Sequence, residues 1–148
     1  MKNTNPSLKH LELFIGEWDM ALSNASFLPD PKTILHGRVV FEWVEDGAFL
    51  VMRQAERARW LIGRDETAKD YVILYSDARG VSRIYQMSFK AKVWKIWRNS
   101  PKFSQRYEGR FSPDRKTITA SWEKSIDGKT WEHDFDLTYT KLRGSPDI

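Results

Sequence analysis

Three histidines are the side chains best able to exchange a proton near pH 7, and one of them stands in an informative pattern. His10 falls in a predicted helix and His36 at the start of a predicted strand. His133 alternates with Trp131 and Phe135, and residues two apart on a strand share a face. We therefore predict that His133 faces the interior of the fold, either as a hydrogen-bonded core histidine or as a ligand to a cofactor.

Two arginines follow the same rule of alternation. Arg53 continues the series of Phe49 and Val51, and Arg83 precedes Tyr85 at a spacing of two. An inward guanidinium in a cavity of low dielectric binds a carboxylate through a charge-assisted, bidentate contact. The pattern therefore predicts an interior anion-binding group, with local ion pairs to neighbouring acids as the simpler alternative.

Aromatic and polar side chains on the same predicted faces complete a candidate ligand-binding set. Gln105 would extend the polar end of this set. The large aromatic rings would serve equally well as ordinary core residues. The predicted set is Trp43, Arg53, Arg83, Tyr85, Tyr107, His133 and Tyr139.

Catalytic motifs are absent from the sequence. It contains no Gly-x-Ser-x-Gly, no glycine-rich phosphate loop and no His-Glu-x-x-His. Asp134 and Asp136 alternate with the apolar residues of their segment, so we expect both on an outer, solvated face. The chain has no cysteine, which rules out disulfides and thiolate metal sites. We predict no catalytic residue and no metal site, and binding in place of catalysis.

Composition indicates one domain, residues 1–148, with a core of ordinary size. The net charge of +4 is mild and its charges are interleaved, which gives weak support to nucleic-acid binding. That alternative would use Trp94 and Arg98 as exposed contacts. The N-terminal residues lack an apolar leader and no segment is long enough for a membrane span, so we expect a cytoplasmic protein.

The elements that must position these residues are one helix and ten strands. A helix is predicted over 6–14, with Ser7 as its N-cap and Leu8, Leu11 and Phe14 on one face. Beyond Gly16 the period is two, interrupted by turn signals such as Asp127-Gly128. The predicted strands cover 17–25, 35–44, 48–56, 58–64, 71–76, 81–89, 93–98, 103–112, 117–124 and 130–141.

Short turns favour antiparallel pairing between consecutive strands, and a ten-stranded meander removes its edges most economically by closing. We predict an all-β fold: a single closed antiparallel meander barrel. Residues 1–15 would plug one end, and 142–148 would form a loose tail. An apolar ligand would enter near the loop 26–34, and the barrel interior would bind it.

Four stretches carry a resemblance to known families. The sequence FIGEW at 14–18 resembles the Gly-x-Trp element of calycins, that is lipocalins, fatty-acid-binding proteins and nitrobindin-like barrels. FEWVEDGAFLVMR at 41–53, YSDARGVSR at 75–83 and WEHDFDLTY at 131–139 resemble the DUF1579 group of uncharacterised bacterial proteins.

The resemblance implies a calycin barrel in which Gly16 and Trp18 close one end, with a basic residue packed across Trp18. Arg143 or Lys141 could supply that cation, and Arg143 is assigned to the plug. Nitrobindin-like relatives also imply haem as an alternative ligand, held by His133. The main prediction has no cofactor: a small apolar or amphipathic molecule binds in the interior. A second alternative is a filled barrel that acts through its outer surface as a homodimer.

Overall fold

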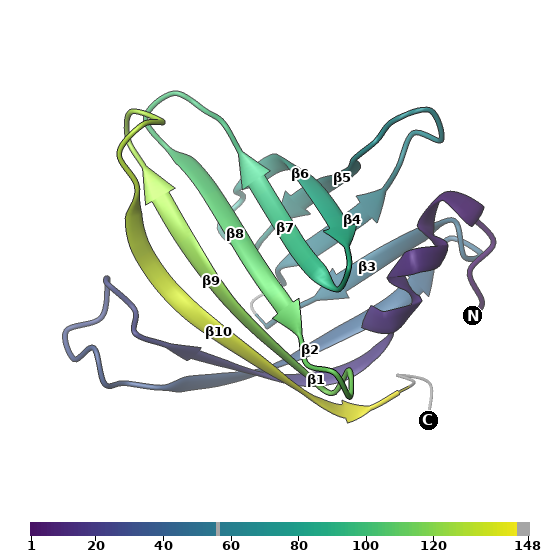
Figure 1. The fold of residues 1–148 in the computed structure, drawn as a ribbon, viewed down its shortest axis with the longest axis horizontal. Coiled ribbons are helices and arrows are strands. Elements are labelled where there is room, and N and C mark those ends of the chain that lie inside the picture. Colours follow the sequence, from purple (N-terminus) through teal and green to yellow (C-terminus); the bar gives the residue numbers. More distant parts are fainter. Residues whose placement is uncertain (56, 145–148) are drawn as a thin grey trace.

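A computed structural model describes residues 1–55 and 57–144, which form one short helix and ten strands (Figure 1). The helix is a 3-10 helix, η1, at Pro6–Phe14. The strands are β1 (Gly16–Ser23), β2 (Leu35–Val44), β3 (Phe49–Arg53), β4 (Arg59–Gly63), β5 (Tyr71–Ser76), β6 (Ser82–Lys90), β7 (Val93–Arg98), β8 (Ser104–Phe111), β9 (Thr117–Ser125) and β10 (Glu132–Arg143).

The ten strands close into an antiparallel barrel in which each strand pairs with its neighbours in the chain. The closing contact joins the first and last strands, where Met20 of β1 pairs with Tyr139 of β10. The predicted all-β, closed ten-strand meander with a short N-terminal helix is confirmed. Since every strand is paired on both sides, the sheet has no free edge to protect.

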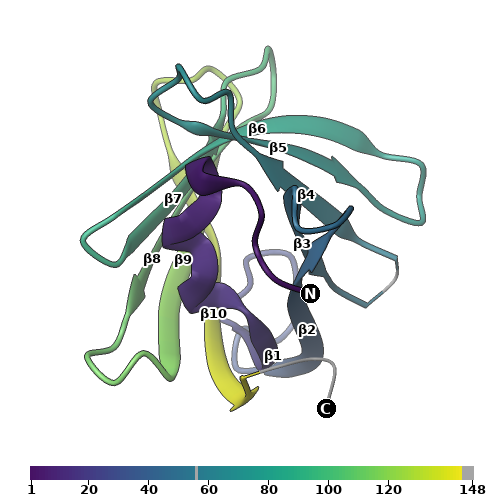
Figure 2. The same cartoon turned by 90° about the vertical axis from the view of Figure 1, so that its right-hand side faces the viewer.

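Helix η1 lies across one end of the barrel (Figure 2). Pro6 opens it, and the side chain of Asn5 accepts a hydrogen bond from the Ser7 amide at 3.0 Å. Asn5 is therefore the N-cap, and the prediction of Ser7 was wrong because Ser7 supplies the capped N–H. The apolar face is fully buried in the barrel and consists of Leu8, Leu11 and Phe14. Within the described part of the chain, no helix has the length and apolar character needed to cross a membrane.

The junction between η1 and β1 closes this end. Gly16 has φ +137°, and a Cβ there would overlap the carbonyl oxygen of Arg143, so a glycine is required. Trp18 is fully buried and its indole Nε1 donates to the Phe14 carbonyl oxygen at 2.9 Å. Lys141 covers the ring, with Nζ 5.2 Å from the ring centroid.

The assignment of Arg143 to the plug is corrected by this geometry. A register shift between Glu17 and Trp18 pairs Trp18 with Lys141, while Arg143 pairs with Glu17. The Arg143 Nε lies 3.0 Å from a Glu17 carboxylate oxygen on the outside of the barrel. The predicted tail is also too long, because β10 continues to Arg143; residues 145–148 lie outside the described residues.

Candidate ligand-binding cavity

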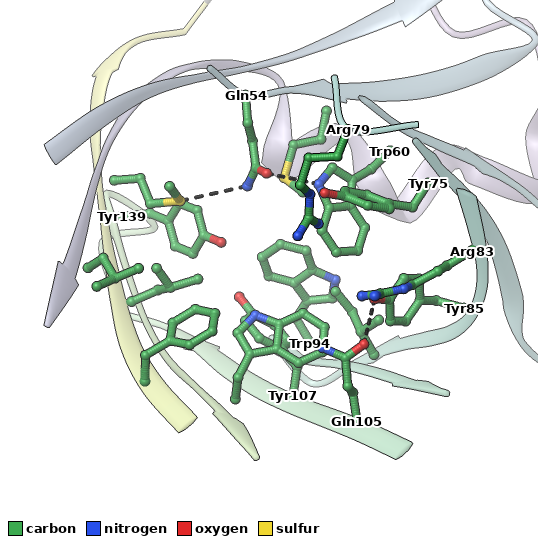
Figure 3. A pocket seen from close by; sticks show the side chains of 17 residues that line it. Gln54, Trp60, Tyr75, Arg79, Arg83, Tyr85, Trp94, Gln105, Tyr107 and Tyr139 are labelled. Atoms are coloured by element: carbon green, nitrogen blue, oxygen red, sulfur yellow. Dashed lines mark hydrogen bonds between the residues drawn. The ribbon is translucent and has the colours of Figure 1, made fainter. Parts of the chain in front are cut away.

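The barrel interior contains a cavity of about 290 Å³ (Figure 3). The β5–β6 turn contributes Arg79 and the start of β6 contributes Arg83. Strand β1 starts at the helix end of the barrel, and each following strand runs in the opposite direction to the one before it. The turn after β5 therefore lies at the end of the barrel away from η1. Most of the remaining lining is aromatic or aliphatic, with two amides, Gln54 and Gln105, near the mouth.

The polar groups near the mouth are held by hydrogen bonds to each other. The Tyr85 hydroxyl donates to Gln105 Oε1 at 2.7 Å. Trp60 Nε1 donates to Gln54 Oε1 at 3.0 Å, and the Gln54 amide reaches the sulfur of Met20 at 3.7 Å. Because both amides are fixed, the shape of the mouth is set before any ligand arrives.

Arg79 is engaged by an acid in its own turn. The Asp77 carboxylate, only 7% exposed, accepts from Arg79 Nη2 and from the Tyr75 hydroxyl, both at 2.6 Å. These donors hold the pKa of Asp77 well below its usual range. Burial, reinforced by the Asp77 charge, raises the pKa of Tyr75 to about 12, so its hydroxyl stays protonated.

The Asp77 cluster predicts a pH-dependent stability. A carboxyl whose pKa is lower in the folded state stabilises the fold above its unfolded pKa, and this contribution is lost as the pH falls. At pH 7 Asp77→Asn should therefore melt at a lower temperature than the wild type. The difference in melting temperature between the two proteins should narrow as the pH drops below 3.8, the ordinary pKa of an aspartate carboxyl. Thermal unfolding followed by circular dichroism across pH 7 to pH 2 measures this, and a constant gap would contradict it.

Arg83 is the cation that no acid neutralises at the mouth. Its guanidinium lies 5.2 Å from the centroid of the Phe103 ring. Among the described residues, no carboxylate lies within ion-pair distance of Arg83, and none lines the cavity. An anionic group at the mouth would therefore meet an available guanidinium.

The inner part of the cavity contains two buried donors. Trp94 is 1% exposed and Tyr107 is 3% exposed, and their ring centroids are 4.8 Å apart. Within the described residues, Trp94 Nε1 has no hydrogen-bond partner, whereas the Tyr107 hydroxyl interacts with the hydroxyl of Tyr139. Burial raises the pKa of Tyr107 and of its neighbour Tyr139 far above the ordinary value, so both hydroxyls are neutral.

Four of the predicted site residues line this cavity: Arg83, Tyr85, Tyr107 and Tyr139. Trp43 does not. It packs at the closed end, where its Nε1 donates to a carboxylate oxygen of Glu12 in η1 at 3.1 Å. Trp43 therefore belongs to the core beneath the helix.

Arg53 was predicted on the wrong face. Met52 and Gln54 point into the cavity, while Arg53 lies outside, 40% exposed, and pairs with Glu42 at 2.6 Å. On β3 the residues of both faces are apolar up to Arg53, so the alternation of side chains could not show which face points inward.

His133 also lies outside the barrel, because β10 contains a bulge. His133 pairs with Glu123 and Phe135 with Trp122, so Asp134 is an extra residue that reverses the alternation. The His133 ring is 45% exposed and contacts Asp136 at 2.8 Å. Asp134, predicted to be solvated, is buried and accepts a hydrogen bond from the Ser26 hydroxyl at 3.1 Å.

Haem does not fit this arrangement. Its predicted ligand His133 faces solvent, and no histidine is found among the described residues that line the cavity. We therefore derive no chemistry through haem.

No family model and no curated protein sequence matches the chain. Among solved structures, the crystal structure of Rv2717c from M. tuberculosis is similar, with a TM-score of 0.61 and 13% sequence identity. The match covers 93% of this chain and 98% of that one. The likeness shows the fold, a calycin-like β-barrel.

Several cavity residues escaped the sequence analysis. Trp94, interpreted there as exposed, faces inward with Ile96, whereas Trp97 lies on the outer face. Trp60 and Trp122 also line the cavity. A signal existed for Trp122, which alternates with Ala120 and Ile118. On β7 both faces carry a tryptophan and an aliphatic residue, so no signal separates them.

Proposed function

We propose that this protein binds a small amphipathic molecule in the barrel interior, with an anionic group of the ligand at the mouth. The observation that carries the proposal is the aromatic cavity of about 290 Å³ whose mouth presents an unneutralised guanidinium, Arg83. An apolar cavity of about 150 Å³ already suffices for benzene, so a ligand of two rings is a reasonable size.

The cavity walls favour a flat, apolar body. Trp60, Tyr85 and Trp122 form one aromatic group, with centroid separations of 5.2 Å, 6.2 Å and 6.0 Å. Ligand sites are typically apolar with a few placed polar groups, and burial contributes about 25 cal/mol per Å² of apolar surface. A planar hydrocarbon body would gain most of its affinity from these rings.

The charges at the mouth favour an acidic head. Asp77 neutralises Arg79, whereas Arg83 stacks on Phe103 and has no carboxylate within ion-pair distance among the described residues. A carboxylate brought into this partly desolvated position would form charge-assisted hydrogen bonds. The filled-barrel alternative has no comparable support, because the interior holds a cavity.

The test is a cavity-filling variant. Leu137 lines the cavity, so Leu137→Trp should occupy it and weaken the binding of biphenyl-4-carboxylate at least tenfold in isothermal titration calorimetry. The matched control is Leu142→Trp, at a half-exposed position on the same strand, which should bind like the wild type. Equal binding by all three proteins would place the ligand outside the barrel and overturn the proposal.

Native mass spectrometry of the freshly purified protein provides an independent measurement. A co-purifying small molecule should be present in the wild type and in Leu142→Trp, and be lost in Leu137→Trp.

Within the calycin fold, we further propose from the motifs at 41–53, 75–83 and 131–139 that the chain is related to the DUF1579 group.

A further inference from the structure

We propose that the protein has a second binding site, a cationic surface cleft at the closed end of the barrel, which binds a phosphate group carrying more than one negative charge. The cleft has a volume of about 530 Å³ and lies between η1, the β4–β5 loop and the β6–β7 turn. It shares no lining residue with the interior cavity. The site therefore goes beyond the proposed function and does not depend on it.

The first step is the charge of the cleft. Four cationic side chains and one imidazole line it: Arg64, Lys69, Lys90, Lys92 and His10. Among the described residues, no carboxylate lines the cleft, and none lies within ion-pair distance of the three lysines. Side chains of one sign that line a concave surface focus their field and attract a counter-ion. An anion would therefore meet several cations that no acid of the cleft neutralises.

The second step is that the walls of the cleft are held together. Arg64 donates from Nε and Nη2 to the Ala68 carbonyl oxygen at 3.0 Å and 2.9 Å, and from Nη1 to the Ser7 carbonyl oxygen at 3.4 Å. One guanidinium thus ties the β4–β5 loop to η1. It also stands 5.3 Å from the centroid of the buried Tyr71 ring. Because these contacts exist without a ligand, the cleft is preorganised, which reduces the ordering cost of binding.

The third step is a strained turn that places two of the lysines. Lys90 pairs with Val93, so Ala91 and Lys92 form the two-residue turn between β6 and β7. Both turn residues have positive φ, +51° and +62°, where asparagine and glycine are the preferred residues. A lysine at the second position is unfavourable for the turn itself, yet it puts a cation beside the cleft. Strain of this kind is concentrated at functional sites.

The fourth step is the chemistry of the ligand. A lysine ammonium is a compact charge with three donors, and it is a common partner of phosphate oxygens. A phosphate monoester carries about −1.5 to −2 charges at pH 7 and three acceptor oxygens, whereas a carboxylate carries a single charge. The phosphate therefore matches a cluster of several cations better. A soluble phosphate compound and the phosphate headgroup of a lipid share this chemistry.

The experiment uses inorganic pyrophosphate as the probe, because it has no apolar part that the aromatic cavity could bind. In isothermal titration calorimetry at low salt, the wild type should bind pyrophosphate about tenfold more tightly than acetate, and the affinity should fall as the salt concentration rises. Saturation of the interior cavity with biphenyl-4-carboxylate should leave the affinity for pyrophosphate unchanged. Displacement of one ligand by the other would place both in one site and overturn the proposal.

Lys92→Gly is the decisive variant, because it separates binding from folding. Glycine adopts a φ of +62° without strain, so the variant should melt no lower than the wild type. Its affinity for pyrophosphate should nevertheless fall about threefold or more, as expected for the loss of one charge-assisted contact. The matched control is Lys102→Gly. Lys102 is an exposed lysine with a φ of +69°, but it lies in the β7–β8 loop at the open end. It should bind pyrophosphate like the wild type.

Two results would overturn the proposal: no binding of pyrophosphate by the wild type, or an equal loss of affinity in Lys92→Gly and Lys102→Gly. The second result would show that net charge alone attracts the anion. Neither result affects the proposed function, since binding of biphenyl-4-carboxylate is measured separately.

Co-sedimentation with phosphatidylcholine vesicles, with and without phosphatidate, distinguishes the two sources of phosphate. Vesicle binding that requires both phosphatidate and Lys92 would support the cleft as a site for a lipid headgroup. Pyrophosphate binding without vesicle binding would support it as a site for a soluble phosphate compound. Vesicle binding that Lys92→Gly retains in full would show that the phosphatidate headgroup does not bind in the cleft, and would overturn the lipid source.

Discussion

Replacing Trp18 by alanine is expected to lower the free energy of unfolding by about 3–5 kcal/mol, the range for truncating a large buried aromatic side chain. The ring is fully buried, and its indole Nε1 is the donor that ties the end of η1, at Phe14, to β1. Lys141 covers one face and Phe111 packs edge-on at 6.1 Å. The alanine variant would lose this packing and leave a cavity at the closed end.

Urea unfolding measures the effect through the midpoint, with the slope as a check on two-state behaviour. Trp97→Ala is the matched control, because Trp97 lies on the outer face and should cost far less. Trp18→Phe, which keeps a ring but loses the donor, should fall between the wild type and the alanine variant. A loss below about 1 kcal/mol in Trp18→Ala would contradict the role of this residue as the barrel plug, because core truncations of this kind cost several times more.

The elements of the fold could be predicted because their signals are local. Alternation and turn residues mark all ten strands, and short turns determine which strands pair. The apolar spacing of Leu8, Leu11 and Phe14 likewise marks the helix that closes the barrel. Closure then follows from the cost of leaving two edges unpaired.

The positions of side chains near bulges could not be predicted, since one extra residue reverses every later assignment. The bulge at Asp134 puts His133 outside, and the register shift beside Trp18 brings Lys141 over the ring in place of Arg143. Neither shift leaves a mark in the alternation. Asp134 is instead held by Ser26, more than a hundred residues earlier in the chain.

Strands that are apolar on both faces caused the other errors. On β3, Val51 is buried although it points outward, so it resembles a core residue in sequence. Arg53 was therefore assigned inward with it. On β7, Trp94 and Trp97 lie on opposite faces, and only the pairing with neighbouring strands decides which one enters the cavity.

The two ends of the barrel therefore differ in purpose. At the closed end, the Phe14 ring of η1 contacts Phe41, Phe89, Trp94 and Phe111, and this packing stabilises the fold. At the open end, amides and arginines surround a cavity. Trp94 belongs to both ends, since it packs on Phe14 and lines the cavity floor. Because a ligand in the cavity binds the folded protein only, its binding should also raise the melting temperature of the protein.

Replacing Arg83 by methionine is the change expected to have the largest effect on binding. A hydrogen bond to a charged group contributes about 1.5–3 kcal/mol, so the affinity for biphenyl-4-carboxylate should fall roughly 10- to 100-fold. Methionine retains an unbranched apolar side chain that can still contact Phe103. Biphenyl-4-methanol, the neutral analogue, should bind Arg83→Met and the wild type alike.

The control for long-range charge is Arg106→Met. Arg106 lies on the outer face, where it pairs with Glu123 at 2.8 Å and its guanidinium carbon stands 4.1 Å from the Trp131 ring centroid. Both substitutions remove one positive charge, but only Arg83 lines the cavity. If Arg106→Met weakened carboxylate binding as much as Arg83→Met, net charge alone would account for the effect, because long-range attraction does not distinguish the two sites. A loss confined to Arg83→Met, and to the anionic ligand, would place the carboxylate in direct contact with the Arg83 guanidinium.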